Sequence, residues 1–219
     1  STVAGAEPEN KVEITKIKTG IMPHGSRISI DGTTHYSVAM MSGELFEIDA
    51  LDLSVKRILS LDNNSNYRNA MHHSKVKPTW VTPHPNGKKL YIAGNGSDEI
   101  FVVDLESFSV EDKLSSGKGP YNLAISPDGK ILLATLKSEG AVSIWSLKNN
   151  KLLKKIKNTT SIPHGVVISP DNKYAFVSVE GVGGDPGKVD VINLETLSLQ
   201  GSINVGKQAG GIAFWKIEQ

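Results

Sequence analysis

The chain contains no cysteine among its 219 residues. Disulfide bonds, thiolate nucleophiles and cysteine-ligated zinc or iron–sulfur sites are therefore excluded. No apolar run approaches the ~18 residues that a membrane-spanning helix requires. A marked excess of one charge is also missing, because 24 Lys and Arg residues stand against 23 Asp and Glu residues. We therefore expect neither a membrane span nor a nucleic-acid partner.

Helical patterning is missing as well, since no long stretch spaces its apolar residues as a helix does. What the chain has instead is a repeat. Four segments align without internal gaps and a fifth copy begins near the C-terminus: 22–38, 77–93, 119–135, 162–178 and 208–219. A period of ~40–50 residues is typical of β-propeller blades. The pattern predicts an all-β fold without a substantial helix.

One position of the repeat carries most of the functional argument. We call the position directly after the repeated proline the slot position. Its successive occupants lie 55, 42, 43 and 46 residues apart, and they are His24, Thr79, Tyr121, His164 and, in the fifth copy, Gly210. Equivalent positions in a propeller lie at equivalent places around its axis, so these side chains should share one end of the central channel.

Each unit reads as four short strands joined by turns such as Pro-Asp-Gly. We predict a single β-propeller domain over residues 1–219, with four complete blades at 21–62, 77–117, 118–159 and 160–206. The alternate apolar residues of the inner strands should be buried. They include Leu123, Ile125, Val166, Ile168 and Ile212.

The two ends of the chain predict a split fifth blade. Residues 11–25 match 151–165, which makes 11–20 a fourth strand and places 1–20 as the outer strands of that blade. Residues 207–219 would supply its inner strand and close the ring. Two alternatives remain open at this point. Five blades close on themselves, or the chain belongs to a seven-bladed propeller that further blades or another chain complete.

The units resemble the YVTN-type β-propeller repeats of bacterial and archaeal proteins that work outside the cytoplasm. The resemblance is clearest at 117–135 and 162–197, where the slot proline, the Ser-Pro-Asp turn and an alternating apolar strand follow one another. It implies a propeller fold and a periplasmic, secreted or cell-surface location. Ligand or partner binding at one face of the ring follows from the fold in general terms.

Histidines gather at one face of the predicted ring. We call it the top face, because it carries the connections between blades. His24 and His164 occupy slot positions, and His72 and His73 lie in the long connection 62–76, which must cross the same face. Imidazole is a common copper and zinc ligand, so these four residues are a candidate site for copper or another transition metal. The competing interpretation is structural, with the slot rings bonded to backbone carbonyls of a neighbouring blade.

A second set of polar and aromatic residues points to a small-molecule pocket on the same face. Some close the second strands of the units and others lie on the inner strands; the set is Arg27, Trp80, Asn95, Tyr121, Asn122, Lys137 and Glu180. Aromatic walls with a few fixed donors and acceptors are typical of ligand pockets. Packing between blades is the competing interpretation.

The favoured hypothesis is a non-catalytic propeller that binds a small molecule or a protein partner through its top face and channel mouth. The alternative is a copper-dependent oxidoreductase that uses the channel-mouth histidines. Architecture alone supports that comparison.

Overall fold

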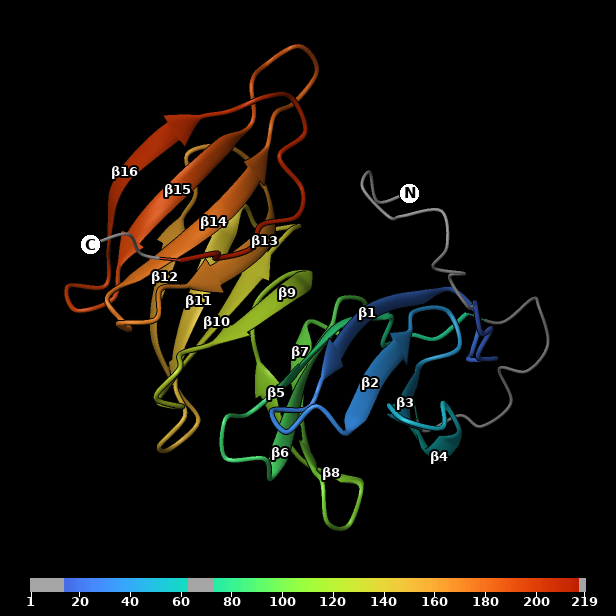
Figure 1. The fold of residues 1–219 in the computed structure, drawn as a ribbon. Coiled ribbons are helices and arrows are strands. Elements are labelled where there is room, and N and C mark those ends of the chain that lie inside the picture. The colour runs from blue at the N-terminus through green and yellow to red at the C-terminus, as the bar shows by residue number, and fades with distance from the viewer. Residues whose placement is uncertain (1–13, 63–72, 217–219) are drawn as a thin grey trace, which may run out of the picture.

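The computed structural model describes residues 14–62 and 73–216, and it folds that part of the chain into 16 strands without a helix (Figure 1). The strands form four antiparallel sheets, each made of four consecutive strands. Blade one contains β1 (Pro23–Ile28), β2 (Thr34–Ala39), β3 (Glu44–Asp49) and β4 (Val55–Ser60). Blade two contains β5 (Pro78–Pro83), β6 (Lys89–Gly94), β7 (Glu99–Asp104) and β8 (Ser109–Ser115). Blade three contains β9 (Pro120–Ile125), β10 (Ile131–Leu136), β11 (Ala141–Ser146) and β12 (Lys151–Lys157). Blade four contains β13 (Ile162–Ile168), β14 (Tyr174–Glu180), β15 (Lys188–Asn193) and β16 (Ser198–Asn204).

The four blades fan out as an arc (Figure 1). Their first strands β1, β5, β9 and β13 contact one another in succession, so they line the inner side of the arc. The predicted all-β propeller architecture with four complete four-stranded blades is thereby confirmed. Within residues 14–62 and 73–216, no helix is long and apolar enough to cross a membrane.

Apolar side chains are buried between neighbouring blades rather than within one of them. Because strand side chains alternate, each middle blade supplies two cores. Ile92 of β6 packs toward blade one, whereas Tyr91 and Ala93 of the same strand pack toward blade three. A third core joins blades three and four. Three residues predicted to be buried are buried, namely Leu123, Val166 and Ile168. Ile125 and Ile212 are only partly buried.

The Pro-Asp-Gly segment forms the tight reversal that its sequence predicts. The Asp128 carboxylate accepts hydrogen bonds from the Ser126 hydroxyl at 2.6 Å and from the Lys130 amide at 3.1 Å. These bonds hold the pKa of Asp128 below its ordinary value, with the Ser126 bond as the largest cause. Gly129 has φ of 72°, a conformation that favours glycine. The turn fixes β9 against β10.

The two ends of the arc differ from the expected fifth blade. Among the described residues, 14–19 and 205–216 form no strand. Residues 210–214 nevertheless follow blade four closely, since the Gly210 carbonyl accepts a hydrogen bond from Ser178 and the Phe214 ring lies 6.2 Å from that of Phe176. Residues 1–13 and 217–219 lie outside the described residues. The domain limits and the closing blade therefore stay predictions.

Candidate functional site

Each inner strand carries one extra residue at the slot position. In blade three, Pro120 pairs with Leu136 and Leu123 pairs with Ala134, so Tyr121 and Asn122 together oppose Thr135. The same shift occurs at the slot positions of the other three inner strands. Such β-bulges bend the strand and re-aim side chains, and they are common beside binding sites. The slot side chains therefore leave the regular alternation of the sheet.

The glycine after each slot histidine allows the next slot segment of the chain to approach closely. A side-chain carbon at Gly25 would come within 2.8 Å of the Cα atom of Trp80, and one at Gly165 would come within 3.0 Å of Gly210 and Ile212. The Pro-His-Gly sequence thus serves two purposes. The glycine closes the joint between blades and the histidine faces the channel mouth.

His24 has a fixed protonation pattern. Its Nδ1 lies 2.8 Å from the Thr79 carbonyl oxygen in blade two. Because a carbonyl can only accept, Nδ1 carries the proton, and Nε2 of the neutral ring is an acceptor. The Tyr121 hydroxyl lies 3.2 Å from this Nε2 and donates to it. The bond to Thr79 is the structural role that the competing interpretation assigned to a slot histidine.

Tyr121 lies at the centre of five side chains from three blades, which we call the channel-mouth cluster. Its ring meets that of His24 edge-on with centroids 5.4 Å apart, and that of His164 with centroids 4.7 Å apart. The Lys137 ammonium lies 4.5 Å from the ring centre of Tyr121. Lys137 also pairs with Glu180 at 3.0 Å. Sequence reasoning had singled out all five residues, and the structure brings them together.

The surroundings of His164 disfavour the protonated form of its ring. Burial lowers its pKa most, and electrostatic interaction with Lys137, and with His24 whenever that ring is protonated, lowers it further. Glu180, whose Oε1 lies 3.7 Å from Nε2 of His164, partly offsets this. The Nδ1 atom of His164 is buried and has no hydrogen-bond partner. A neutral imidazole beside a lysine can accept a proton or a hydrogen bond.

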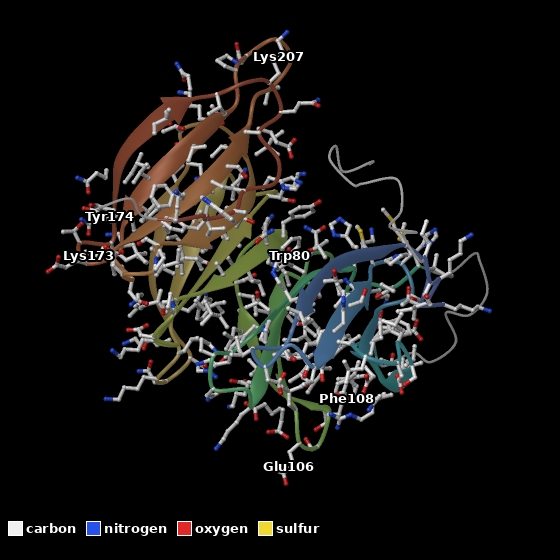
Figure 2. The ribbon with its side chains drawn as sticks, viewed as in Figure 1. Trp80, Glu106, Phe108, Lys173, Tyr174 and Lys207 are labelled. Atoms are coloured by element: carbon white, nitrogen blue, oxygen red, sulfur yellow. The ribbon has the colours of Figure 1, made fainter. Side chains whose placement is uncertain are left out.

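The remaining predicted site residues lie on inner strands or directly after β6. Arg27, Trp80 and Asn122 belong to β1, β5 and β9, and Asn95 follows β6. The Arg27 guanidinium stacks 4.2 Å from the ring centre of Trp80, which Figure 2 places on the inner side of the arc. Trp80 Nε1 and Asn122 Oδ1 are buried without a hydrogen-bond partner. Asn95 donates to the Pro120 carbonyl at 3.4 Å, so its amide joins blades two and three. Buried polar atoms without a partner are uncommon in folded proteins.

The metal candidates remain separate in the described part of the chain. His72 lies outside the described residues, and His73 is exposed. The phenol ring of Tyr121 contacts both His24 and His164. Among the residues that the structure describes, no group of three or more His, Asp or Glu side chains is arranged to hold a metal ion.

Sequence reasoning missed two hydroxyls that organise the slots. Thr135 accepts a hydrogen bond from the Asn122 amide at 2.9 Å, and Ser178 accepts one from the Gly165 amide at 2.8 Å. The repeat alignment contains a sequence signal for these two hydroxyls. Both residues close the repeated segment in one alignment column, where the other two blades have apolar side chains.

Comparison with protein families supports the architecture. The family described as "Lactonase, 7-bladed beta-propeller" matches residues 31–170, more than half of the chain.

Two curated relatives cover different shares of the chain. Antigen Lp49 of Leptospira interrogans is 26% identical over 193 residues, which are 78% of this chain and 39% of that protein. Protein groucho of Drosophila melanogaster is 32% identical over 90 residues, which are 40% of this chain and 12% of that protein. The chain therefore spans well under half the length of these relatives.

A solved structure gives the same picture of the fold. Hydrazine synthase of Kuenenia stuttgartiensis superposes with a TM-score of 0.75 at 22% identity, and the match covers 90% of this chain and 53% of that one. At this identity the likeness concerns the fold alone.

Proposed function

Since the chain belongs to the lactonase family of seven-bladed β-propellers, we propose that it binds a small molecule at its channel mouth through the channel-mouth cluster. The observation that carries the proposal is the meeting of His24, Tyr121 and His164, from three different blades, at the bulges of their inner strands. Side chains that converge from separate elements are typical of binding sites, whereas packing residues usually repeat the same apolar type.

The charges of the site favour an anionic ligand. Within the channel-mouth cluster, Lys137 and Glu180 balance each other. Protonation of either imidazole adds positive charge, as does the Arg27 guanidinium that stacks on Trp80 of the neighbouring inner strand. Lys137 binds Glu180 through one of its three N–H groups, and the others are available to a carboxylate or phosphate.

We extend the proposal to the type of repeat and to the location of the protein in the cell. We assign the repeats to the YVTN type, which implies a role in the periplasm, at the cell surface or outside the cell. Fractionation of the source cells tests this location. A protein partner at the top face is the alternative occupant, and it would leave the small-molecule probes below unbound.

The binding proposal is tested with acetate, gluconate and phosphate as anionic probes, and with glucose as a neutral probe. We expect the anions to shift the NMR signals of Tyr121 and His164. Lys137→Met should weaken anion binding about tenfold or more, the effect of losing one charged hydrogen bond. Lys113→Met is the matched control. Lys113 also lies over an aromatic ring, that of Phe101, and also pairs with a glutamate. Equal weakening by both variants, or no anion binding by the wild type, would overturn the proposal.

A second candidate function is lactone hydrolysis, which the family description and one geometric feature favour. His24 is oriented by the Thr79 carbonyl so that its Nε2 is the basic atom, and Tyr121 is bonded to that atom. A water that takes the place of the Tyr121 hydroxyl can give a proton to this Nε2 as it adds to a lactone carbonyl, while Lys137 stabilises the negative charge on the carbonyl oxygen. The ring C–O bond then breaks, and the imidazolium returns the proton to the leaving alkoxide.

Hydrolysis of glucono-δ-lactone, followed with a pH indicator, tests this second candidate. His24→Ala should remove the activity, whereas His35→Ala, outside the cluster, should retain it. Hydrolysis no faster than in buffer would exclude this reaction for this lactone and leave the binding proposal standing. No arrangement of His, Asp or Glu side chains in the described residues supports the copper alternative.

A further inference from the structure

We infer that Thr135, which is not a member of the channel-mouth cluster, is a positioning residue that sets Tyr121 against His164. Thr135 is fully buried in β10. Its hydroxyl accepts from the Asn122 amide at 2.9 Å and donates to the His164 carbonyl at 2.9 Å. One hydroxyl therefore ties the bulge of blade three to the bulge of blade four.

Two kinds of side chain donate hydrogen bonds to the backbone carbonyls of the slot residues. Each slot carbonyl from blade two onward accepts a hydrogen bond from the preceding blade. In blades one and two the slot side chain itself is the donor, since His24 donates to the Thr79 carbonyl and the Thr79 hydroxyl donates to the Tyr121 carbonyl at 2.8 Å. The second strand offers only Val38 and Ala93 at the equivalent column.

Blades three and four use the second strand instead. Thr135 donates to the His164 carbonyl, and Ser178 donates to the Gly210 carbonyl. The slot side chains Tyr121 and His164 are thereby released from the joint between blades. Tyr121 can then direct its hydroxyl to His24, and His164 can face Glu180 and Lys137. The hydroxyls of Thr135 and Ser178 thus replace Tyr121 and His164 as hydrogen-bond donors between blades. Tyr121 and His164 can therefore contact the other members of the cluster.

Loss of the Thr135 hydroxyl should move the two rings apart. The Asn122 amide and the His164 carbonyl would both be left in a buried place without their hydrogen-bond partner, which is unfavourable for each group. The backbone would have to shift to reach water or another partner. Tyr121 directly precedes Asn122, and the second carbonyl belongs to His164 itself. Any such shift therefore changes the 4.7 Å contact between the two rings.

The test compares Thr135→Val, which keeps the shape and removes the hydroxyl, with Thr135→Ser, which keeps the hydroxyl. The readout is the NMR cross-relaxation between the Tyr121 and His164 rings. We expect Thr135→Val to lose at least half of its intensity and Thr135→Ser to restore it. Ser169→Ala is the matched control, because it removes a buried hydroxyl that bonds the Asp171 carboxylate and the Tyr174 amide at the end of β13 opposite to His164. An unchanged ring signal in Thr135→Val, or equal loss in Ser169→Ala, would overturn the inference.

A second measurement covers the case in which Thr135→Val fails to fold. Hydrogen exchange of the wild-type Asn122 amide should be slow and should quicken in Thr135→Ser only slightly. Rapid exchange in the folded wild type would contradict the bond to Thr135. The part of the inference that concerns ligands rests on the proposed function. The ring signal and the amide exchange need no ligand, so failure of anion binding and failure of the positioning role give different results.

Discussion

The Tyr121 hydroxyl lies 3.2 Å from Nε2 of His24, although 97 residues separate the two in the chain. The bond joins blade one to blade three across the inner strand of blade two. Thr79, the slot residue of blade two, is small and fully buried.

Replacement of Tyr121 by phenylalanine should remove this bond and keep the ring. We expect the free energy of unfolding to fall by about 0.5–1.5 kcal/mol, the usual net value of one neutral hydrogen bond. The ¹⁵N signal of His24 Nε2 should move while that of Nδ1 stays in place, since Nδ1 remains bonded to Thr79. Urea unfolding and ¹⁵N NMR measure the two effects. An unmoved Nε2 signal would argue against the bond in solution.

Stability should fall in mild acid because of His164. Its pKa in the folded chain is lowered, chiefly by burial and then by Lys137 and His24, with Glu180 acting in the opposite sense. The unfolded chain therefore binds more protons than the folded chain between the lowered pKa and the ordinary value of about 6.5. The free energy of unfolding should decrease as the pH falls below that value. Urea unfolding between pH 5 and 8 measures it.

Replacement of His164 by glutamine provides the comparison for this pH effect. The variant should lose the part of the acid dependence that belongs to the imidazole, so its stability should change less steeply over the same range. Curves that stay parallel for wild type and variant would mean that other groups cause the dependence.

Replacement of Glu180 by glutamine should lower the pKa of His164 further, because this carboxylate is the group that raises it. Lys137 would lose its 3.0 Å partner and stay near the imidazole, which strengthens the effect. NMR titration of the His164 ring measures the shift. Glu139→Gln is the control, since Glu139 pairs with Lys155 away from the cluster. A higher pKa in Glu180→Gln would contradict this account of the site.

A substitution outside the cluster should lower the stability of the fold and leave the arrangement of the cluster unchanged. Asp190 of β15 is fully buried, and its carboxylate accepts hydrogen bonds from Asn158, from the Thr159 amide and from the Thr159 hydroxyl. Asp190→Ala should lower the free energy of unfolding by about 3 kcal/mol or more, because several buried donors lose their acceptor. Below its unfolding temperature, the variant should still show the Tyr121–His164 ring signal. Loss of that signal in the folded variant would show that blade packing and cluster are coupled.

Much of the architecture could be predicted from the repeat, because turn residues and strand periodicity recur at fixed offsets. The slot alignment also predicted that His24 and His164 lie at equivalent places, and it singled out Tyr121, Lys137 and Glu180. The bulge could not be predicted, since a gapless alignment of repeats does not show that one strand carries an extra residue relative to its partner. The link between Tyr121 and His24 depends on this bulge.

The ends were harder to predict for a different reason. The match of residues 11–20 to the fourth strand of blade three records sequence similarity, but a strand also needs a partner edge. Residues 14–19 form no strand, and Ile17 packs on the core of blade one instead. Residues 210–214 lie beside Ser178 and Phe176 of blade four but form no strand either, so the closing inner strand stays a prediction.

The second-strand hydroxyl has a consequence for how such a chain can change over time. A blade copied together with its hydroxyl carries its own means of attachment to the next blade. The residue at its slot is then no longer needed for attachment, and it can be exchanged for one with new chemistry while the joint stays intact. In blades one and two the same exchange at His24 or Thr79 would loosen the joint as well. New binding preferences should therefore arise more readily at Tyr121 and His164 than at the two preceding slots.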